Sequence, residues 1–195
     1  MKRTVITAFI VGLIASAVVT DAQKKEWSFP RTKSYGRATT EYNGVLHVVI
    51  NYDYSQRKHG SKWLLVDIGM SAGKRFVLHK NDLKLLTPNG RELPVAPQQA
   101  LNDDTAGITS VLQNASIWRR PLEHYFNQRG MIERFRFQVA PPGAGTVTDE
   151  VVVDNDWVAL GAVFFRTPDG TWDAGTYRLE INTTVDKAAL PIKLE

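Results

Sequence analysis

The stretch over residues 157–181, WVALGAVFFRTPDGTWDAGTYRLEI, constrains the fold more than any other part of the sequence. Two apolar runs flank the tetrapeptide TPDG, in which Pro fixes φ, Asp can hydrogen-bond its own backbone and Gly accepts a positive φ. The first run is apolar almost throughout and predicts a strand covered on both faces, whereas residues 176–181 alternate between apolar and polar side chains. We therefore predict a β-hairpin here, built into a β-rich domain.

Short strands separated by turns are predicted along most of the remaining chain. Apolar runs or alternations that are typical of strands occur at residues 45–54, 63–70, 75–78, 82–87, 92–95, 131–139 and 189–194. The sequence TPNG at residues 87–90 repeats the pattern of TPDG and predicts a tight hairpin turn. Strands and helices do not alternate along the chain, which argues against a parallel α/β sheet and favours an antiparallel β-sandwich.

The apolar period changes to three and four between residues 104 and 130. Asp104 is placed to cap the start of a helix, and Pro121 interrupts the pattern and fits the first position of a second short helix that Gly130 would end. We expect residues 96–102 to be a polar connector that leads into this helical insertion. One helical stripe contains Ile108, Val111, Leu112, Ala115 and Trp118.

Residues 62–95 carry a recognisable order of sheet segments. The aromatic-led run WLLVDIGM precedes the short run FVL, and DLKLLTPNG follows with a turn at its Gly. This order resembles Ig-like domains of exported bacterial proteins, in which an Asn often follows the first strand where this chain has Ser71 and Ala72. The resemblance implies an Ig-like β-sandwich fold and says little about function.

The first residues predict export. Lys2 and Arg3 precede an apolar run of about 15 residues, shorter than the roughly 20 that a membrane-spanning helix needs. Small residues near Ala17 and Ala22 fit a cleavage site. We predict a cleavable signal peptide over residues 1–22, a single extracytoplasmic domain over 23–195, periplasmic or secreted, and no stable membrane span after cleavage. The alternative is an uncleaved membrane anchor.

Charge and cysteine content exclude several classes of function. The formal net charge is +4 and the basic residues are scattered, whereas nucleic-acid binding needs a concentrated basic face. The composition therefore predicts no nucleic-acid partner. The chain contains no Cys, which excludes disulfides, a thiol nucleophile and thiolate metal sites.

Motifs for catalysis or metal binding are missing from the sequence. The four histidines show neither HExxH nor HxH spacing, and no GxSxG or SxxK sequence is present. We therefore predict no catalytic residue, no metal site and no cofactor, although a pair of carboxylates that meet only in space is not excluded by spacing. Calcium binding by Asp154 and Asp156 is left open, with an Asx turn as the favoured reading.

Residues 117–129, IWRRPLEHYFNQR, contain the side-chain types that dominate protein interfaces. The candidate partner-binding residues are Trp118, Arg119, Arg120, His124, Tyr125 and Arg129. The competing interpretation is that the aromatic side chains seal the helices onto the sandwich and the arginines are merely solvated.

Two functions follow from these observations. The first is a non-catalytic exported Ig-like module that binds another envelope or secreted protein, or an envelope component. The second is a small extracytoplasmic hydrolase or a ligand carrier with a pocket under the helical insertion. A flat patch around Trp118 and Arg120 would favour the first, and a cleft with perturbed titratable groups would favour the second.

Overall fold

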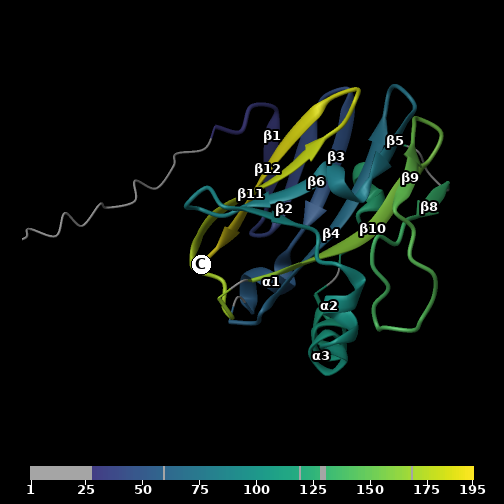
Figure 1. Ribbon diagram of the computed structural model, residues 1–195. Coiled ribbons are helices and arrows are strands. Elements are labelled where there is room, and N and C mark those ends of the chain that lie inside the picture. Colours follow the sequence, from purple (N-terminus) through teal and green to yellow (C-terminus); the bar gives the residue numbers. More distant parts are fainter. Residues whose placement is uncertain (1–27, 59, 119, 128–130, 168) are drawn as a thin grey trace, which may run out of the picture.

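The computed structural model describes residues 28–58, 60–118, 120–127, 131–167 and 169–195. The predicted signal peptide over residues 1–22 lies outside this part of the chain. Within it the protein is mainly β, as predicted, with a few short helices (Figure 1).

The larger of the two main sheets has six strands. Every neighbouring pair in it is antiparallel except β10 and β8, which run parallel. Its strands in spatial order are β1 (Thr32–Tyr35), β2 (Thr39–Asn43), β3 (Leu46–Asn51), β4 (Trp63–Ala72), β10 (Val158–Arg166) and β8 (Ile132–Arg134).

A four-stranded antiparallel sheet faces it. Its order is β12 (Lys187–Leu194), β11 (Gly175–Asn182), β6 (Leu83–Leu86) and β7 (Glu92–Pro94). The predicted hairpin around residues 87–90 is confirmed, because Leu86 pairs with Glu92 across it. A separate pair consists of β5 (Phe76–His79) and β9 (Glu150–Val153).

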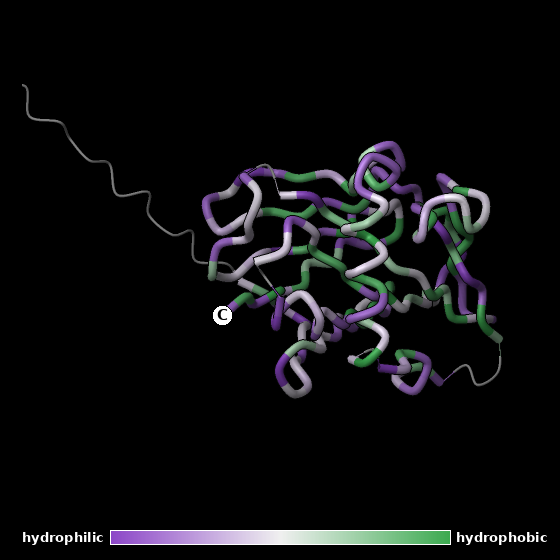
Figure 2. Tube along the Cα trace, turned by 90° about the horizontal axis from the view of Figure 1, so that it is seen from below, coloured by the Kyte–Doolittle hydropathy of each residue, from purple (hydrophilic) through white to green (hydrophobic). Residues whose placement is uncertain are grey.

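The two main sheets enclose one hydrophobic core, which confirms the β-sandwich. Apolar side chains of both sheets are fully buried there, among them Ile68 and Val163 from the larger sheet and Leu85, Leu179 and Leu190 from the smaller one. Figure 2 shows hydrophobic stretches along the central strands and hydrophilic stretches mainly in the peripheral turns.

The hairpin predicted over residues 157–181 is wrong. β10 pairs with β4 and β8 in the larger sheet, whereas β11 pairs with β12 and β6 in the smaller one. The TPDG turn therefore carries the chain from one sheet to the other. The prediction that the first run is covered on both faces is confirmed, because Val163 faces the core and Phe164 faces the opposite side, both buried.

Helices cover one end of the outer face of the larger sheet. α2 (Gln98–Asn102) and α3 (Thr105–Ala115) pack Leu101, Ile108 and Val111 against Trp63 and Phe164. The helix predicted after Asp104 is confirmed, but the connector expected over residues 96–102 contains α2. The Asp104 carboxylate accepts a hydrogen bond from Trp63 Nε1 at 2.5 Å and an ion pair from Lys62 at 2.9 Å, which fixes the start of α3 on the sheet.

A second cover lies further along the same face. Leu122 and Phe126 pack on Val49, Val158 and Leu160. The second helix predicted from Pro121 is wrong, because the described part of it forms one 3-10 turn, η2 (Glu123–Tyr125). Phe126 is extended, with φ −111° and ψ 148°, so its ring can enter the space over Gly69, where a Cβ would lie 2.8 Å from it.

The strand predicted over residues 131–139 is largely wrong. β8 covers only three residues. After β8, the side chain of Gln138 makes the hydrogen bonds to β10 that the backbone of a longer strand would make. The Gln138 amide accepts from the Phe164 N–H at 2.7 Å and donates to the carbonyls of Phe164 at 3.1 Å and Ala96 at 2.6 Å. The alternation correctly predicts buried Phe135 and Phe137, but Gln138, expected on the opposite face, is buried as well.

Two short helices were not expected. α1 (Asp53–Arg57) occupies the end of the strand predicted over residues 45–54 and the residues that follow it. The 3-10 turn η1 (Lys80–Asp82) precedes β6.

Candidate functional site

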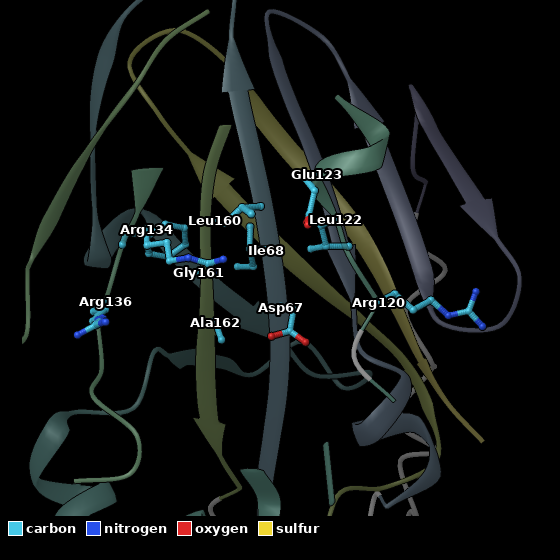
Figure 3. A pocket seen from close by; sticks show the side chains of 11 residues that line it. Asp67, Ile68, Arg120, Leu122, Glu123, Arg134, Arg136, Leu160, Gly161 and Ala162 are labelled. Atoms are coloured by element: carbon cyan, nitrogen blue, oxygen red, sulfur yellow. The ribbon is translucent and has the colours of Figure 1, made fainter. Parts of the chain in front are cut away.

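A pocket of about 290 Å³ opens on the outer face of the larger sheet, between its two covers (Figure 3). Its base comes from β4 and β10, and its walls come from the segment before η2 and from β8 with the residues that follow it. The lining residues are Asp67, Ile68, Arg120, Leu122, Glu123, Arg134, Phe135, Arg136, Leu160, Gly161 and Ala162. We call this the outer-face pocket.

Strand register brings the base of the outer-face pocket together. Asp67 on β4 pairs with Ala162 on β10, and Ile68 pairs with Gly161. A Cβ at Gly161 would overlap the ring of Phe135, so the missing side chain lets this ring pack against β10 on the core side of the sheet. On the outer side, the small side chain of Ala162 leaves the base open between Phe164 and Leu160, which the two covers bury.

The edge of β10 adds backbone groups to the outer-face pocket. Phe135 donates its N–H to the Leu160 carbonyl at 3.0 Å, and Gln138 binds both backbone groups of Phe164. In an extended strand, alternate residues direct their N–H and C=O groups to the same edge. The backbone groups of Ala162 therefore lie on this edge, between the positions that Phe135 and Gln138 satisfy.

Charges of both signs surround the outer-face pocket. In Figure 3 the carboxylates of Asp67 and Glu123 and the guanidinium of Arg134 point toward the open space, whereas the guanidinium groups of Arg120 and Arg136 point outward from its rim. Asp67 and Glu123 are half-buried, and the three arginines are exposed. This arrangement suits a ligand group that both donates and accepts hydrogen bonds.

The structure divides the predicted partner-binding residues among different roles. Arg120 lines the outer-face pocket. Trp118 is 38% exposed and stacks on Arg57, whose guanidinium carbon lies 4.2 Å from the ring centroid. Tyr125 is half-buried, with its ring 5.4 Å from that of Tyr35, and His124 is exposed on η2.

Tyr125 therefore packs against the second cover, in line with the competing interpretation. The ring of Trp118 packs on Arg57 and is partly exposed to solvent. Arg119 and Arg129 lie outside the described residues.

Four charged lining residues were missed: Asp67, Glu123, Arg134 and Arg136. The sequence did indicate Asp67 as a candidate, because its carboxylate interrupts an otherwise apolar strand. Nothing in the sequence indicated Arg134, because its position beside Leu160 depends on the parallel pairing of β8 with β10.

Most of the exposed apolar side chains in the described chain lie close in sequence to residues that line the outer-face pocket. The large hydrophobic residues that are exposed in the described chain are Val45, Val77, Ile117, Trp118, Met131 and Ile132. Four of these six lie within three positions of Arg120 or Arg134, which line the pocket. Ile117 is 72% exposed and Met131 57%. Trp118 and Asp67 line a small cavity next to the outer-face pocket.

Metal ligation has no support in the described ranges. No group of three or more His, Cys, Asp or Glu side chains there could hold a metal ion. Asp154 Oδ1 accepts the N–H of Asp156 at 2.8 Å, which is the Asx turn favoured over a calcium site. Among the helices of this part of the chain, none has the length and apolar character required to cross a bilayer.

Comparisons of the chain with protein-family models, with curated proteins and with solved structures found no match. The function is therefore argued from the geometry of the outer-face pocket and its surroundings.

Proposed function

We propose that the protein is a non-catalytic exported module that binds an extended segment of another envelope or secreted protein on the outer face of its larger sheet. The observation that carries the proposal is the charged outer-face pocket, whose lining residues Arg120 and Arg134 follow the exposed apolar pairs Ile117–Trp118 and Met131–Ile132 in the sequence. Export rests on the basic and apolar pattern of residues 1–22. The Ig-like character rests on the pattern of residues 62–95, which forms β4 to β7.

The surroundings of the pocket match the anatomy of a protein interface. Tightly bound partners are held by a few apolar, aromatic and Arg side chains around a centre that excludes water. Here Arg120 and Arg134 line the pocket, and the exposed Ile117, Trp118 and Ile132 precede them by two or three positions in the sequence. A partner side chain that enters the pocket would meet both carboxylates and a guanidinium.

The backbone of Ala162 favours an extended partner segment. Peptides commonly bind to sheet edges through main-chain hydrogen bonds, and pockets beside the edge then select side chains. The pocket provides one open position on the edge of β10, next to charged groups from three other segments. A segment that pairs with Ala162 would place its neighbouring side chains against Leu160 and Arg134.

A ligand carrier is the second candidate. Its support is the group of Asp67, Glu123 and Arg134, which point into the same space (Figure 3). A small polar ligand would need this group and would make no use of Ile117 or Ile132. The two candidates therefore differ in how binding responds to changes at the apolar side chains outside the pocket.

Site-specific crosslinking tests the proposal. A photo-reactive amino acid is placed at Ile132 in one preparation and at Val77 in another, because both side chains are 41% exposed and Val77 lies in β5, away from the pocket. We expect the Ile132 probe to capture one protein of the envelope fraction and the Val77 probe to capture none. Equal capture at the two positions would contradict the proposal.

The captured partner is then measured with a charge-reversal variant. Arg120→Glu with Arg134→Glu should weaken its binding at least tenfold, while the melting temperature stays within a few degrees, because exposed charge changes usually cost under about 0.5 kcal/mol. Arg37→Glu with Arg75→Glu changes the same number of exposed arginines elsewhere and serves as the control. Loss of binding in both double variants would indicate a net-charge effect. Normal binding by the variant at the pocket would exclude the outer-face pocket as the site.

A further inference from the structure

A second pocket, of about 260 Å³, lies between the two Thr-Pro-Asx-Gly turns. Thr87, Pro88 and Asn89 form one wall, and Thr167 and Asp169 belong to the other. Leu93, Trp172 and Tyr177 line it as well, and it shares no residue with the outer-face pocket. We call it the turn pocket.

One side-chain hydrogen bond recurs in both walls of the turn pocket. Thr87 Oγ1 donates to the Arg91 carbonyl at 3.2 Å, and Thr167 Oγ1 donates to the Thr171 carbonyl at 2.9 Å. Arg91 Nη1 and Asp169 Oδ2 lie 4.0 Å apart and connect one wall to the other. A pocket that is already formed loses little entropy when it binds a ligand.

The lining combines buried aromatic side chains with uncommitted polar groups. The rings of Trp172 and Tyr177 meet edge to face, with centroids 5.6 Å apart. Trp172 is 5% exposed, and its Nε1 has no hydrogen-bond partner within the described chain. This nitrogen is itself buried inside the protein, so Trp172 offers the pocket part of its ring and not its N–H.

Three exposed residues of the turn pocket have polar side-chain groups that are available to a ligand. In the described chain, the Asp173 carboxylate and the Thr171 hydroxyl make no hydrogen bond or ion pair, and both residues are exposed. The Asn89 amide oxygen stays within its own turn, where it accepts the Arg91 N–H and shares the single Thr87 hydroxyl proton with the Arg91 carbonyl. Its NH₂ group is left to donate. The pocket thus offers donors and acceptors side by side.

We infer that the turn pocket binds one ring of a neutral saccharide. Adjacent hydroxyls of a sugar donate to carboxylates such as Asp173 and accept from amide or guanidinium groups such as Asn89 and Arg91. The C–H face of the ring packs on apolar and aromatic side chains, here Leu93 and Trp172. The volume lies just below the roughly 300–1,000 Å³ of pockets for drug-sized ligands, which restricts the ligand to a small ring.

The signs of the lining charges favour a neutral ligand. The charges of Arg91 and Asp169 cancel, and the phenol of Tyr177 is neutral. The carboxylate of Asp173 therefore gives the pocket lining a net charge of one negative unit. An anionic ligand would face repulsion from two carboxylates. A neutral sugar is not repelled, and its hydroxyls can bind both the carboxylates and the guanidinium.

Saturation-transfer NMR and tryptophan fluorescence test the inference with D-glucose, D-galactose, D-mannose, N-acetyl-D-glucosamine and D-glucuronate as probes. We expect at least one neutral sugar to bind saturably in the millimolar range, and glucuronate to bind more weakly than glucose. Asp173→Ala should weaken the binding roughly tenfold, as removal of a charged hydrogen-bond partner does, and Asn89→Ala should weaken it less. Asp156→Ala removes an exposed carboxylate outside the pocket and should leave the affinity unchanged.

Three outcomes would overturn the inference: no saturable binding of any neutral sugar, tighter binding of glucuronate than of glucose, or unchanged affinity in Asp173→Ala. Because all these substitutions are at exposed positions, a folded variant is expected, and circular dichroism checks it. The Arg120→Glu, Arg134→Glu variant should bind sugar normally. The inference therefore stands or falls separately from the proposed protein-binding function.

Discussion

The two Thr-Pro-Asx-Gly turns share their local structure and differ in what they connect. Gly90 has φ +85° and Gly170 φ +93°, and in each turn the Thr hydroxyl donates to the carbonyl four residues later. Yet the first turn joins β6 to its neighbour β7, whereas the second takes the chain from β10 in one sheet to β11 in the other.

The difference arises in the residues after the glycine. In the first turn the chain re-enters the ladder at Glu92, opposite Leu86. In the second, residues 171–174 intervene, and Trp172 turns into the core between the sheets. β11 then starts at Gly175, with φ +153°, where a Cβ would lie 2.8 Å from Pro88. The turn residues thus set the local geometry, and a buried side chain outside them decides which sheet the chain joins.

The largest expected effect is that of Trp172→Ala. Removal of a buried Trp side chain costs about 3–5 kcal/mol, and here it also removes the anchor of the connection between the sheets. Asn89→Ala, in the hairpin turn, removes an exposed side chain and should cost under about 1 kcal/mol. Urea unfolding of both variants measures the difference. Equal losses of unfolding free energy would show that the connection does not depend on Trp172.

A smaller effect, about equal in the two turns, is expected from substitution of their glycines. Gly170→Val and Gly90→Val should each cost about 1 kcal/mol or more, because a β-branched residue is penalised at positive φ. A Cβ at either position would meet no atom within 4 Å, so the cost comes from the backbone alone. The Asn variants should cost less, since Asn tolerates this region.

Thermal and urea unfolding of the four glycine variants provide the measurement. If Val and Asn were equally destabilising, the glycines would have ordinary negative φ values in solution. If the cost differed between the two turns, their local structures would be less alike than the hydrogen bonds indicate.

The smallest expected effect concerns Tyr177, which ties the start of β11 to the connection by donating to the Asp173 carbonyl at 2.9 Å. Tyr177→Phe should cost about 1 kcal/mol at neutral pH, the typical net value of one hydrogen bond. Burial, with a contribution from the charge of Asp173, raises the pKa of Tyr177 to about 12. The hairpin turn has no corresponding tyrosine among the residues that line the turn pocket.

The raised pKa makes the effect of Tyr177→Phe depend on pH. Between the usual pKa near 10 and the raised value, the folded protein retains the phenol proton that the unfolded chain has lost, so its stability falls as the pH rises through this window. The variant lacks this contribution, and its difference from wild type should shrink above about pH 10. Urea unfolding at neutral and alkaline pH tests this, and a constant difference would contradict it.

Most strands of the sandwich could be predicted from the sequence, but their partners could not. Alternation and apolar runs depend on which faces are buried, and residues 157–165 and 176–181 were correctly assigned as strands on that basis. Hairpin formation was inferred from the turn alone, and it succeeded at residues 87–90 and failed at 167–170. Similarly, residues 135–139 alternate like a strand, but Gln138 replaces the ladder with side-chain hydrogen bonds.

Less of the outer-face pocket could be predicted. Arg120 was named, because a cluster of Trp and Arg is visible in one segment. Asp67 and Arg134 come from strands far apart in the sequence, and only the order β4, β10, β8 brings them to one place. The pocket itself depends on the small side chain of Ala162 between two covers, and the positions where those covers pack on the sheet could not be predicted from the sequence.

The amide of Gln138 has a consequence for the behaviour of the protein at high concentration. A long unpaired sheet edge is a template for aggregation. On this edge of β10, the residues from Val158 to Leu160 pair with β8 and Phe135. Further along, the Gln138 side chain binds both backbone groups of Phe164. The unpaired part of this edge is thereby reduced to the neighbourhood of Ala162, which is too short for a second copy to add a full strand. One polar side chain thus shortens the edge on which a second copy could pair, and we expect Gln138→Ala to aggregate more readily than the wild type.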